Sequence, residues 1–396
     1  MKSILGIEES ALIRSGGIHT AREIWQQPEV WSEVYELIRS QETEISCFMR
    51  DAMKRSDKII LTGAGTSGFI GLSLEKDFVK RWGVSTRAIA TTDLVTHPAD
   101  YFNKQEKILL ISFARSGNSP ESCAAVELAE QLSGSVLHLI ITCDPTGNLA
   151  NYHRVAEQLV VCLPENSNDR SLAMTSSYTG MMLAGVLISR IHSLKEEKQR
   201  VLKMISYGNR ILTEYAWKLK EVAGMAFSRA VFLGSGPQWG TATESNLKLQ
   251  ELTDGYVVSK MDTFLGFRHG PKAVVNSETL VVNLFSNHPY ALCYERDLVT
   301  GMKRGKQCLY RIGIFETKDI EEFIVEKMDL SIVLSENQGH LDEEYLSICN
   351  VLPAQLLGFF KSLDLGLSPD NPSKSGAISR VVKGVKIYPY ELCDQN

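Results

Sequence analysis

The residues best suited to chemistry gather around one stretch, Lys107–Ser122, which reads KILLISFARSGNSPES. Its apolar first half predicts a buried strand, and its second half carries hydroxyls at Ser116, Ser119 and Ser122. An apolar-periodic run follows, so these hydroxyls and the free backbone N–H groups of a helix N-terminus would face one point. Such a point suits an anion, most of all a phosphate. The plainer alternative is a helix start with Pro120 in its first turn.

A second candidate loop lies upstream at Gly63-Ala64-Gly65-Thr66-Ser67-Gly68, after a predicted strand at 57–62 and before a predicted helix. Its G-x-G-x-x-G spacing is typical of dinucleotide-binding folds. That fingerprint also needs an acid about 20 residues further on. The nearest acid, Asp93, is better placed to cap a helix. Thr66 and Ser67 favour hydroxyl contacts to a small sugar phosphate, while dinucleotide binding stays as the competing interpretation.

The segment Thr243–Pro271 contains a set of acid–base groups. Glu244, Lys248 and Glu251 fall at i, i+4 and i+7, on one face of a predicted helix. An exposed, salt-bridged helix face is the plain alternative. His269 follows in an Arg-His-Gly-Pro loop, where Gly-Pro bars further helix. A carboxylate and an imidazole are the groups that sugar ring opening and proton transfer between adjacent carbons require.

The elements that must position these groups alternate between strand and helix. Short apolar stretches predict strands at 57–62, 86–91, 107–113, 136–142 and 158–162. The pattern then repeats, because Arg229–Pro237 echoes the strand and loop at 58–66, and further strands are predicted at 279–285, 308–314 and 331–334. Alternation of this kind predicts an α/β fold with parallel sheets covered by helices on both faces. The predicted segments are a helical N-terminal arm (1–50), two α/β domains (51–200 and 205–375) and a tail that closes over the site (376–396).

Composition narrows the class of protein. The chain has 396 residues, 44% of them hydrophobic, which is enough for two domains. A formal net charge of −5 without a basic cluster argues against a nucleic-acid surface. We expect no membrane span, because no run of ~18 apolar residues occurs. Eight scattered cysteines and a start without a signal-peptide core indicate reduced thiols and a cytoplasmic location. Neither the cysteines nor the histidines show metal-site spacing, so we expect no metal.

These motifs resemble the sugar isomerase (SIS) domain family over almost the whole chain. Three segments are similar to the hydroxyl loops that hold the sugar phosphate in the isomerase half of glucosamine-6-phosphate synthase: Gly65-Thr66-Ser67, Ser116-Gly117-Asn118-Ser119 and Thr175-Ser176-Ser177. Lys248–Glu251 resembles that enzyme's L-K-E segment, and Phe267–Pro271 resembles its K-H-G-P loop. The resemblance implies two tandem SIS domains, each a flavodoxin-like three-layer sandwich.

The same resemblance implies roles for individual residues. Glu251 would shuttle the proton, and His269 would assist ring opening from a neighbouring subunit, which requires at least a homodimer. Lys383 lies in a tail segment similar to the family's closing segment, and it or Lys248 would stabilise negative charge that develops on a substrate oxygen. The hydroxyls expected to hold the phosphate are those of Ser67, Ser116, Ser119 and Ser122. Arg115 has no counterpart in the family loops and stays unassigned.

Within the family, the arm with Gly17–Thr20 and the NPSKSG tail resemble the AgaS-type galactosamine-6-phosphate deaminase/isomerases, also called tagatose-6-phosphate ketose/aldose isomerases. This implies conversion of D-galactosamine 6-phosphate to D-tagatose 6-phosphate and ammonia, without a metal or organic cofactor. Met1 is not followed by Cys, so we expect no ammonia from glutamine. Two alternatives stay open: isomerisation without loss of nitrogen, and a non-catalytic regulator that binds a sugar phosphate.

Overall fold

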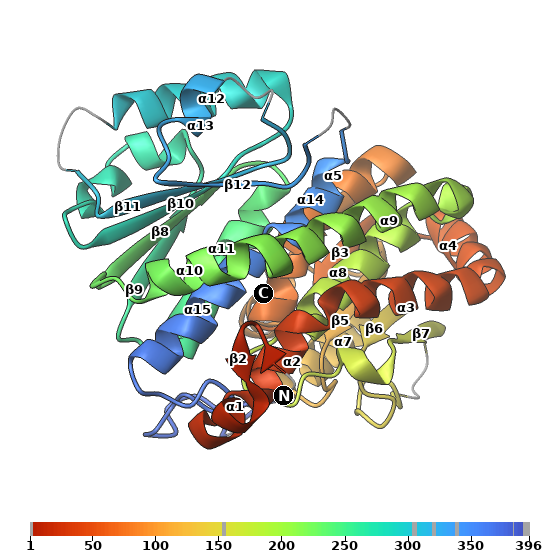
Figure 1. The fold of residues 1–396 in the computed structure, drawn as a ribbon. Helices are drawn as coiled ribbons and strands as arrows, with labels where there is room; N and C mark the ends of the chain where they lie inside the picture. The colour runs from red at the N-terminus through yellow and green to blue at the C-terminus, as the bar shows by residue number, and fades with distance from the viewer. Residues whose placement is uncertain are drawn as a thin grey trace.

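Two five-stranded parallel sheets organise the protein (Figure 1). The computed structural model describes residues 3–152, 156–302, 307–318, 322–336, 340–382 and 384–390. Helices flank each sheet, so the predicted α/β class with two repeated units is confirmed.

The first sheet has the strand order β4-β3-β5-β6-β7. Its strands are β3 (Lys58–Thr62), β4 (Ser85–Ala88), β5 (Lys107–Ala114), β6 (Ser135–Thr142) and β7 (Gln158–Cys162). The intervening helices are α5 (Thr66–Trp82), α6 (Thr91–Thr96) and α7 (Pro120–Leu132). Every strand was predicted, although the predicted 86–91 strand ends at Ala88 because α6 begins at Thr91.

The second sheet has the order β12-β11-β10-β8-β9. Its strands are β8 (Arg229–Gly234), β9 (Val258–Asp262), β10 (Thr279–Leu284), β11 (Tyr310–Phe315) and β12 (Leu330–Val333), and its helices are α11 (Gln238–Leu252), α12 (Pro289–Gly301) and α13 (Glu322–Val325). Counted along the chain, both sheets read second-first-third-fourth-fifth, which is the flavodoxin-like order. Sequence analysis missed β9, a polar, half-exposed edge strand that lacks an apolar run.

Helices that join and follow the sheets fill the space between them. They are α8 (Ser176–Ser189), α9 (Leu194–Arg210), a π-turn (Ile211–Tyr215), α10 (Ala216–Ala223), α14 (Glu343–Cys349) and α15 (Leu352–Asp364). All fourteen residues of α8 are buried. The helical stretch Glu343–Asp364 is long and apolar enough to span a membrane, but 94% of its most apolar window lies inside the protein. Its hydropathy therefore reflects a place in the core.

The predicted N-terminal arm is helical but belongs to the same core. A short hairpin, β1 (Ser3–Ile4) and β2 (Ile7–Glu8), leads into α1 (Glu9–Ser15), α2 (Ile18–Trp25), α3 (Gln27–Ser40) and α4 (Glu42–Arg55). Trp31 of α3 is fully buried, and its indole N–H donates to Thr179 Oγ1 of α8 at 2.9 Å. The arm thus completes the packing around α8 rather than forming a separate unit.

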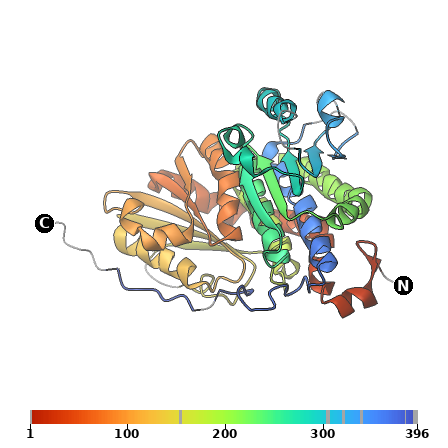
Figure 2. The same ribbon diagram turned by 90° about the vertical axis from the view of Figure 1, so that its left-hand side faces the viewer.

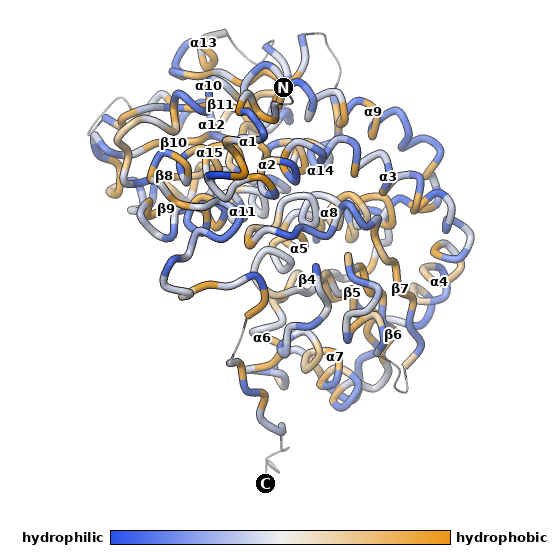
Figure 3. The backbone as a smooth tube through the Cα atoms, turned by 60° about the horizontal axis from the view of Figure 1, so that its bottom comes forward, coloured by the Kyte–Doolittle hydropathy of each residue, from blue (hydrophilic) through white to orange (hydrophobic). Residues whose placement is uncertain are grey.

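The tail after α15 has no regular secondary structure in its described part. It leaves the second-sheet half and runs as an extended segment along the first-sheet half (Figures 2 and 3). Near its end, the carbonyl of Tyr390 accepts a hydrogen bond from Gln131 Nε2 of α7. The tail therefore crosses the region where the predicted hydroxyl loops lie.

Candidate functional site

Two of the three predicted hydroxyl loops meet at the carboxyl edge of the first sheet. One follows β3 and the other follows β5, the neighbouring strands at which the sheet's connections change direction. Open α/β sheets bind their ligands in the crevice at such a switch point. A cavity of about 110 Å³ lies there and is called the hydroxyl pocket below. It is lined by Ala64, Ser67, residues 113–117, Ser119, Ser122, Met174 and the tail residues 380–382.

The loop after β3 is shaped by its glycines. Gly65 has φ +54°, a left-handed conformation that side chains disfavour. A Cβ on Gly63 would lie 2.5 Å from the carbonyl carbon of Ser67, so only glycine allows this turn. The turn places Thr66 and Ser67 at the start of α5, and the backbone N–H groups of Ser67 and Gly68 donate within the turn to the carbonyls of Ala64 and Gly65.

The conformation of the loop after β5 is fixed by a glycine and by a hydrogen bond. Gly117 has φ +65°, and Asn118 Oδ1 accepts a hydrogen bond from the backbone N–H of Asn148 at 2.9 Å. Ser119 is the N-cap of α7, and its Oγ lies 2.5 Å from Ser122 Oγ. These two hydroxyls thus hydrogen-bond to each other at the helix N-terminus. The alternative of a helix start with Pro120 in its first turn is confirmed, and the anion site at the same residues stays a prediction.

The third predicted loop, Thr175–Ser177, does not line the hydroxyl pocket. Its hydroxyls are fully buried, and Thr175 and Ser177 both donate to the carboxylate of Asp169. The carboxylate also accepts three backbone N–H bonds at the start of α8. Because Asp169 already places negative charge there, a phosphate would be repelled. Met174, the preceding residue, is the one that reaches the pocket, which sequence reasoning missed.

The acid–base groups lie on α11, which packs against α5. Lys248 is fully buried, with Nζ 2.6 Å from Glu251 Oε2, 3.2 Å from Glu244 Oε1 and 3.4 Å from Thr66 Oγ1. These contacts join α11 of the second half to the glycine loop of the first. The predicted helical face is confirmed, but it is buried, so the exposed salt-bridge alternative is wrong.

Burial and charge act in opposite directions on these groups. Burial lowers the pKa of Lys248, but Glu244 and Glu251 outweigh it and raise the pKa, so the ammonium stays charged. Burial raises the pKa of Glu244 to about 7, even though Lys248 opposes the shift. The Glu251 side chain is 22% exposed and thus remains accessible, unlike the other two. Of the three, Glu251 alone can face a ligand.

His269 has no printed contact with these acid–base groups of α11 within the chain. His269 is exposed and follows a short 3₁₀ turn, Gly266–Arg268, and it does not line the hydroxyl pocket. Lys383 lies outside the described residues. The tail residues just before it, Arg380, Val381 and Val382, do line the pocket. The closing role of the tail stays a prediction.

Arg115, unassigned from the sequence, holds the tail in place. Its guanidinium is buried and donates to the carbonyls of Ser171, Leu172 and Arg380, the last at 2.6 Å. Arg380 in turn donates to the carbonyl of Asp169 at 2.7 Å. Burial lowers the pKa of Arg115, although nearby acids including Asp169 and Glu251 oppose that shift. The lone arginine of the β5 loop therefore holds the tail, and it also lines the hydroxyl pocket.

The dinucleotide alternative rested on Asp93. Asp93 lies in the first turn of α6, but the N-cap is Ala90 and no side chain makes a capping hydrogen bond, so the expectation that Asp93 caps the helix is wrong. In the parts of the chain that the structure describes, no group of three His, Cys, Asp or Glu side chains could hold a metal ion.

Comparison with known proteins shows the family of this chain. The SIS domain model matches residues 52–189. The D-galactosamine-6-phosphate deaminase AgaS of Shewanella sp. (strain ANA-3) is 40% identical over 98% of this chain and 96% of its own. The crystal structure of tagatose-6-phosphate ketose/aldose isomerase from Escherichia coli has a TM-score of 0.85 and 36% identity, and covers 95% of this chain and 97% of its own.

A more distant match concerns the fold alone. The C-terminal domain of glucosamine-fructose-6-phosphate aminotransferase from Francisella tularensis has a TM-score of 0.70 at 18% identity, covering 88% of this chain and 96% of its own. Near-complete coverage by a relative at 40% identity, together with the SIS match, is decisive for family membership. The chain therefore belongs to the AgaS family of SIS-domain proteins.

Proposed function

We propose that this protein is a D-galactosamine 6-phosphate deaminase that forms D-tagatose 6-phosphate and ammonia. The observation that carries the proposal is the contact between the two halves. Lys248 and Glu251 of α11 lie beside Thr66, in the same glycine loop that supplies Ser67 to the hydroxyl pocket. This chain of contacts supports a base that acts beside the proposed anion site. AgaS relatives at about 40% identity carry the deaminase name.

The phosphate would bind first and fix the position of the sugar. Ser67, Ser116, Ser119 and Ser122 supply hydroxyls, and the first turns of α5 and α7 supply backbone N–H groups. The sugar's C1 and C2 would then extend toward Glu251. The tail residues 380–382 would cover the bound substrate and exclude water from it.

The chemical steps then need a proton carrier and charged groups to stabilise the intermediate. After ring opening, Glu251 takes the C2 proton, and the electron pair moves to the C1 carbonyl and gives an enolamine. Return of the proton to C1 leaves an imine at C2, and addition of water there releases ammonia and the ketose. Lys248, kept charged by its two carboxylates, stabilises the negative charge on oxygen. The tail's Lys383 is proposed to assist it.

Ring opening is assigned to His269 of a second subunit. The side chain is exposed within one chain and does not line the hydroxyl pocket, as expected if it serves a neighbouring site. The proposed assembly is therefore at least a homodimer. A cytoplasmic location is proposed with it, as fits a metabolic enzyme with unpaired cysteines in its described part.

The deciding experiment incubates the purified protein with D-galactosamine 6-phosphate and assays ammonia and ketose separately. Wild type should release both in equal amounts, and Glu251→Gln should lose about 10²–10⁴-fold in kcat because the proton carrier is gone. Glu221→Gln, an exposed acid on α10, is the matched control and should keep full activity. No turnover by wild type, or full turnover by Glu251→Gln, would reject the proposal.

One alternative has a specific observation in its favour. The solved E. coli relative at 36% identity is named a tagatose-6-phosphate ketose/aldose isomerase. Both reactions share the proton shift between C2 and C1, so the site geometry serves either. Ketose or aldose formation from a hexose phosphate that has no amino group, with no ammonia from the amino sugar, would favour isomerisation.

A further inference from the structure

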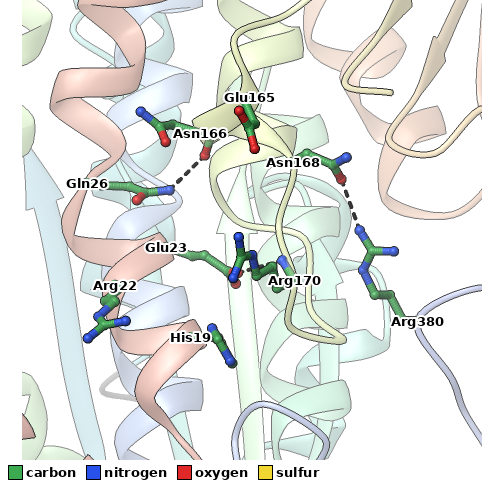
Figure 4. A pocket seen from close by; sticks show the side chains of 9 residues that line it. All are labelled: His19, Arg22, Glu23, Gln26, Glu165, Asn166, Asn168, Arg170 and Arg380. Atoms are coloured by element: carbon green, nitrogen blue, oxygen red, sulfur yellow. Dashed lines mark hydrogen bonds between the residues drawn. The ribbon is translucent and has the colours of Figure 1, made fainter. Parts of the chain in front are cut away.

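A second cavity, larger than the hydroxyl pocket, lies between the N-terminal arm and the tail. Its volume is about 390 Å³, within the range of small-molecule sites. It shares Arg380 with the hydroxyl pocket, while every other residue that lines it is different. It is called the arginine pocket below, and Figure 4 shows its lining side chains.

Three guanidinium groups line the arginine pocket, and they come from distant parts of the chain. Arg22 lies on α2, Arg170 follows the 3₁₀ turn Glu165–Ser167, and Arg380 lies in the tail. Among the described residues, the Arg170 guanidinium has neither a hydrogen-bond nor an ion-pair partner. The pocket thus gathers cationic donors beyond those its own contacts use.

Arg22 is ion-paired with Glu9 of α1, which does not line the pocket, and the acids that line the pocket do not balance Arg170 and Arg380. The Glu23 carboxylate is buried and turned to the chain, where it accepts hydrogen bonds from the backbone N–H groups of Arg170 and Ser171. Burial, and then the charge of Asp169, raises its pKa to about 7, so it carries only part of a negative charge near neutral pH. Glu165 is the one other acid that lines the pocket. The pocket is therefore suited to an anion.

Amide side chains add uncharged hydrogen-bond donors and acceptors to the arginine pocket. Gln26, Asn166 and Asn168 line it together with His19. Gln26 Nε2 already donates to the Asn166 carbonyl at 2.7 Å, and Asn168 Oδ1 accepts from Arg380 at 2.9 Å (Figure 4). The remaining amide donors and acceptors can pair with hydroxyl groups, which offer both roles. Cations beside amides match a ligand with a phosphate at one end and hydroxyls along its length.

We propose that the arginine pocket binds a phosphorylated polyol or sugar, at a site separate from the hydroxyl pocket. The phosphate lies between Arg170 and Arg380, where charge-assisted hydrogen bonds are strongest. The amides contact the hydroxyls.

Occupancy of the arginine pocket acts on the tail. Arg380 already ties the tail to Asn168 and to the Asp169 carbonyl, and its own carbonyl accepts from Arg115. A ligand that binds the Arg380 guanidinium adds a further attachment. It therefore stabilises residues 380–382 in their place along the hydroxyl pocket, and the two sites are coupled through one residue.

The first test measures binding by calorimetry, using D-glucitol 6-phosphate and inorganic phosphate as probes. Ser119→Ala/Ser122→Ala serves as the background protein, because it weakens the hydroxyl pocket and isolates the other site. We expect this protein to retain one binding site. Adding Arg170→Gln should weaken binding about tenfold or more. Adding Arg14→Gln, which removes the same charge from an exposed residue on α1, should leave binding unchanged.

Two results would overturn the proposal: no binding by the background protein, or equal binding with and without Arg170→Gln. Glucitol 6-phosphate should bind at least ~3-fold more tightly than inorganic phosphate, because its hydroxyls contact the amides. Equal affinities would overturn the assignment to a polyol. Arg170 is exposed, so its replacement should not unfold the protein.

The second test follows the tail directly. Trypsin cleaves after Arg380, and glucitol 6-phosphate should slow that cut severalfold in the background protein but not when Arg170→Gln is added. Protection that persists with Arg170→Gln would contradict the coupling. Neither test needs turnover, so failure here is distinct from failure of the proposed deaminase activity.

Discussion

The two sheets share one topology, yet the corresponding loops hold different things. In the first sheet, the loop after the third strand, β5, opens into the hydroxyl pocket. In the second, the loop after the third strand, β10, is filled by the protein itself. The Ser286 backbone N–H donates to Glu295 at 2.9 Å, and its hydroxyl donates to Glu343. The position that can accept an anion from outside in one half holds the chain's own carboxylates in the other.

This difference is consistent with separate roles for the two halves. In the proposed function, the first half binds the phosphate at its switch point, and the second half contributes α11 with Glu251 and Lys248. The proposal therefore assigns binding to one copy of the fold and chemistry to the other. The following changes test that division, beginning with the largest expected effect.

Replacing Lys248 by Met should lower the free energy of unfolding by about 3–5 kcal/mol, because buried Glu244 and its neighbour Glu251 lose their counter-charge. Activity should fall with it. Chemical denaturation and the ammonia assay measure both. Lys361→Met is the matched control: this lysine is also buried, but its partner Asp364 is 40% exposed, so its loss should cost less. Equal destabilisation by both changes would contradict the special role of α11.

The hydroxyl loops of the two halves can be compared by removing hydroxyls from each. Ser119→Ala/Ser122→Ala should raise KM about 10–100-fold, since charge-assisted hydrogen bonds to the phosphate are lost. Ser286→Ala should leave KM unchanged, because its hydroxyl serves Glu343. Steady-state kinetics with the amino sugar phosphate decide the matter. A comparable rise in KM from Ser286→Ala would show that both loops bind substrate.

The filled loop of the second half should make stability depend on pH. Burial raises the pKa of Glu295 to about 8 in the folded protein, from an ordinary value of 4.5. The folded protein therefore keeps a proton that the unfolded chain releases, and stability falls as pH rises from about 4.5 to 8. Glu295→Gln removes this loss. Its free energy of unfolding, relative to wild type, should therefore rise across that range by an amount on the order of 2 kcal/mol, and its Tm should rise with it.

Scanning fluorimetry between pH 5 and 8 measures this advantage, with Glu29→Gln on α3 as an exposed control. A Tm difference that is independent of pH would mean that the Glu295 carboxyl is not buried as a neutral acid.

The smallest expected effect comes from the tail. Arg115→Lys keeps a positive charge but loses the planar fork that reaches three carbonyls at once. Release of Arg380 should raise KM about fivefold, with a smaller change in kcat. The exposed Arg87→Lys on β4 is the control. An unchanged KM would show that the tail closes without this attachment.

Much of the fold could be predicted because strong local patterns carried it. Long apolar runs such as Lys107–Phe113 are buried strands, and the Gly63–Gly68 loop lies between strand and helix as its spacing required. β9 was not predicted, because it is a polar strand at the edge of its sheet and has no apolar run. The two hydroxyl loops next to neighbouring strands were also predicted, since strand order in a repeated α/β unit brings them together.

The prediction that Thr175–Ser177 contact the phosphate failed for a reason that no local pattern contains. The carboxylate of Asp169, six residues upstream of Thr175, accepts hydrogen bonds from the hydroxyls of Thr175 and Ser177. Hydroxyl-rich sequence at a helix start is equally suited to a phosphate and to a carboxylate from the chain. Which of them binds depends on where the preceding loop leads.

By itself, the sequence determined the two parallel sheets, the glycine and serine loops and the acid–base face of α11, because periodicity and glycine geometry are local properties. Only the tertiary structure decided which of these face each other. In the folded chain, Lys248 is buried between two carboxylates beside Thr66, and Arg115 donates to a carbonyl of the tail. The loop after β10 is occupied by Glu295, whereas the equivalent loop after β5 is not. Those outcomes depend on contacts between residues far apart in the chain, whose energies come from burial and charge at close range.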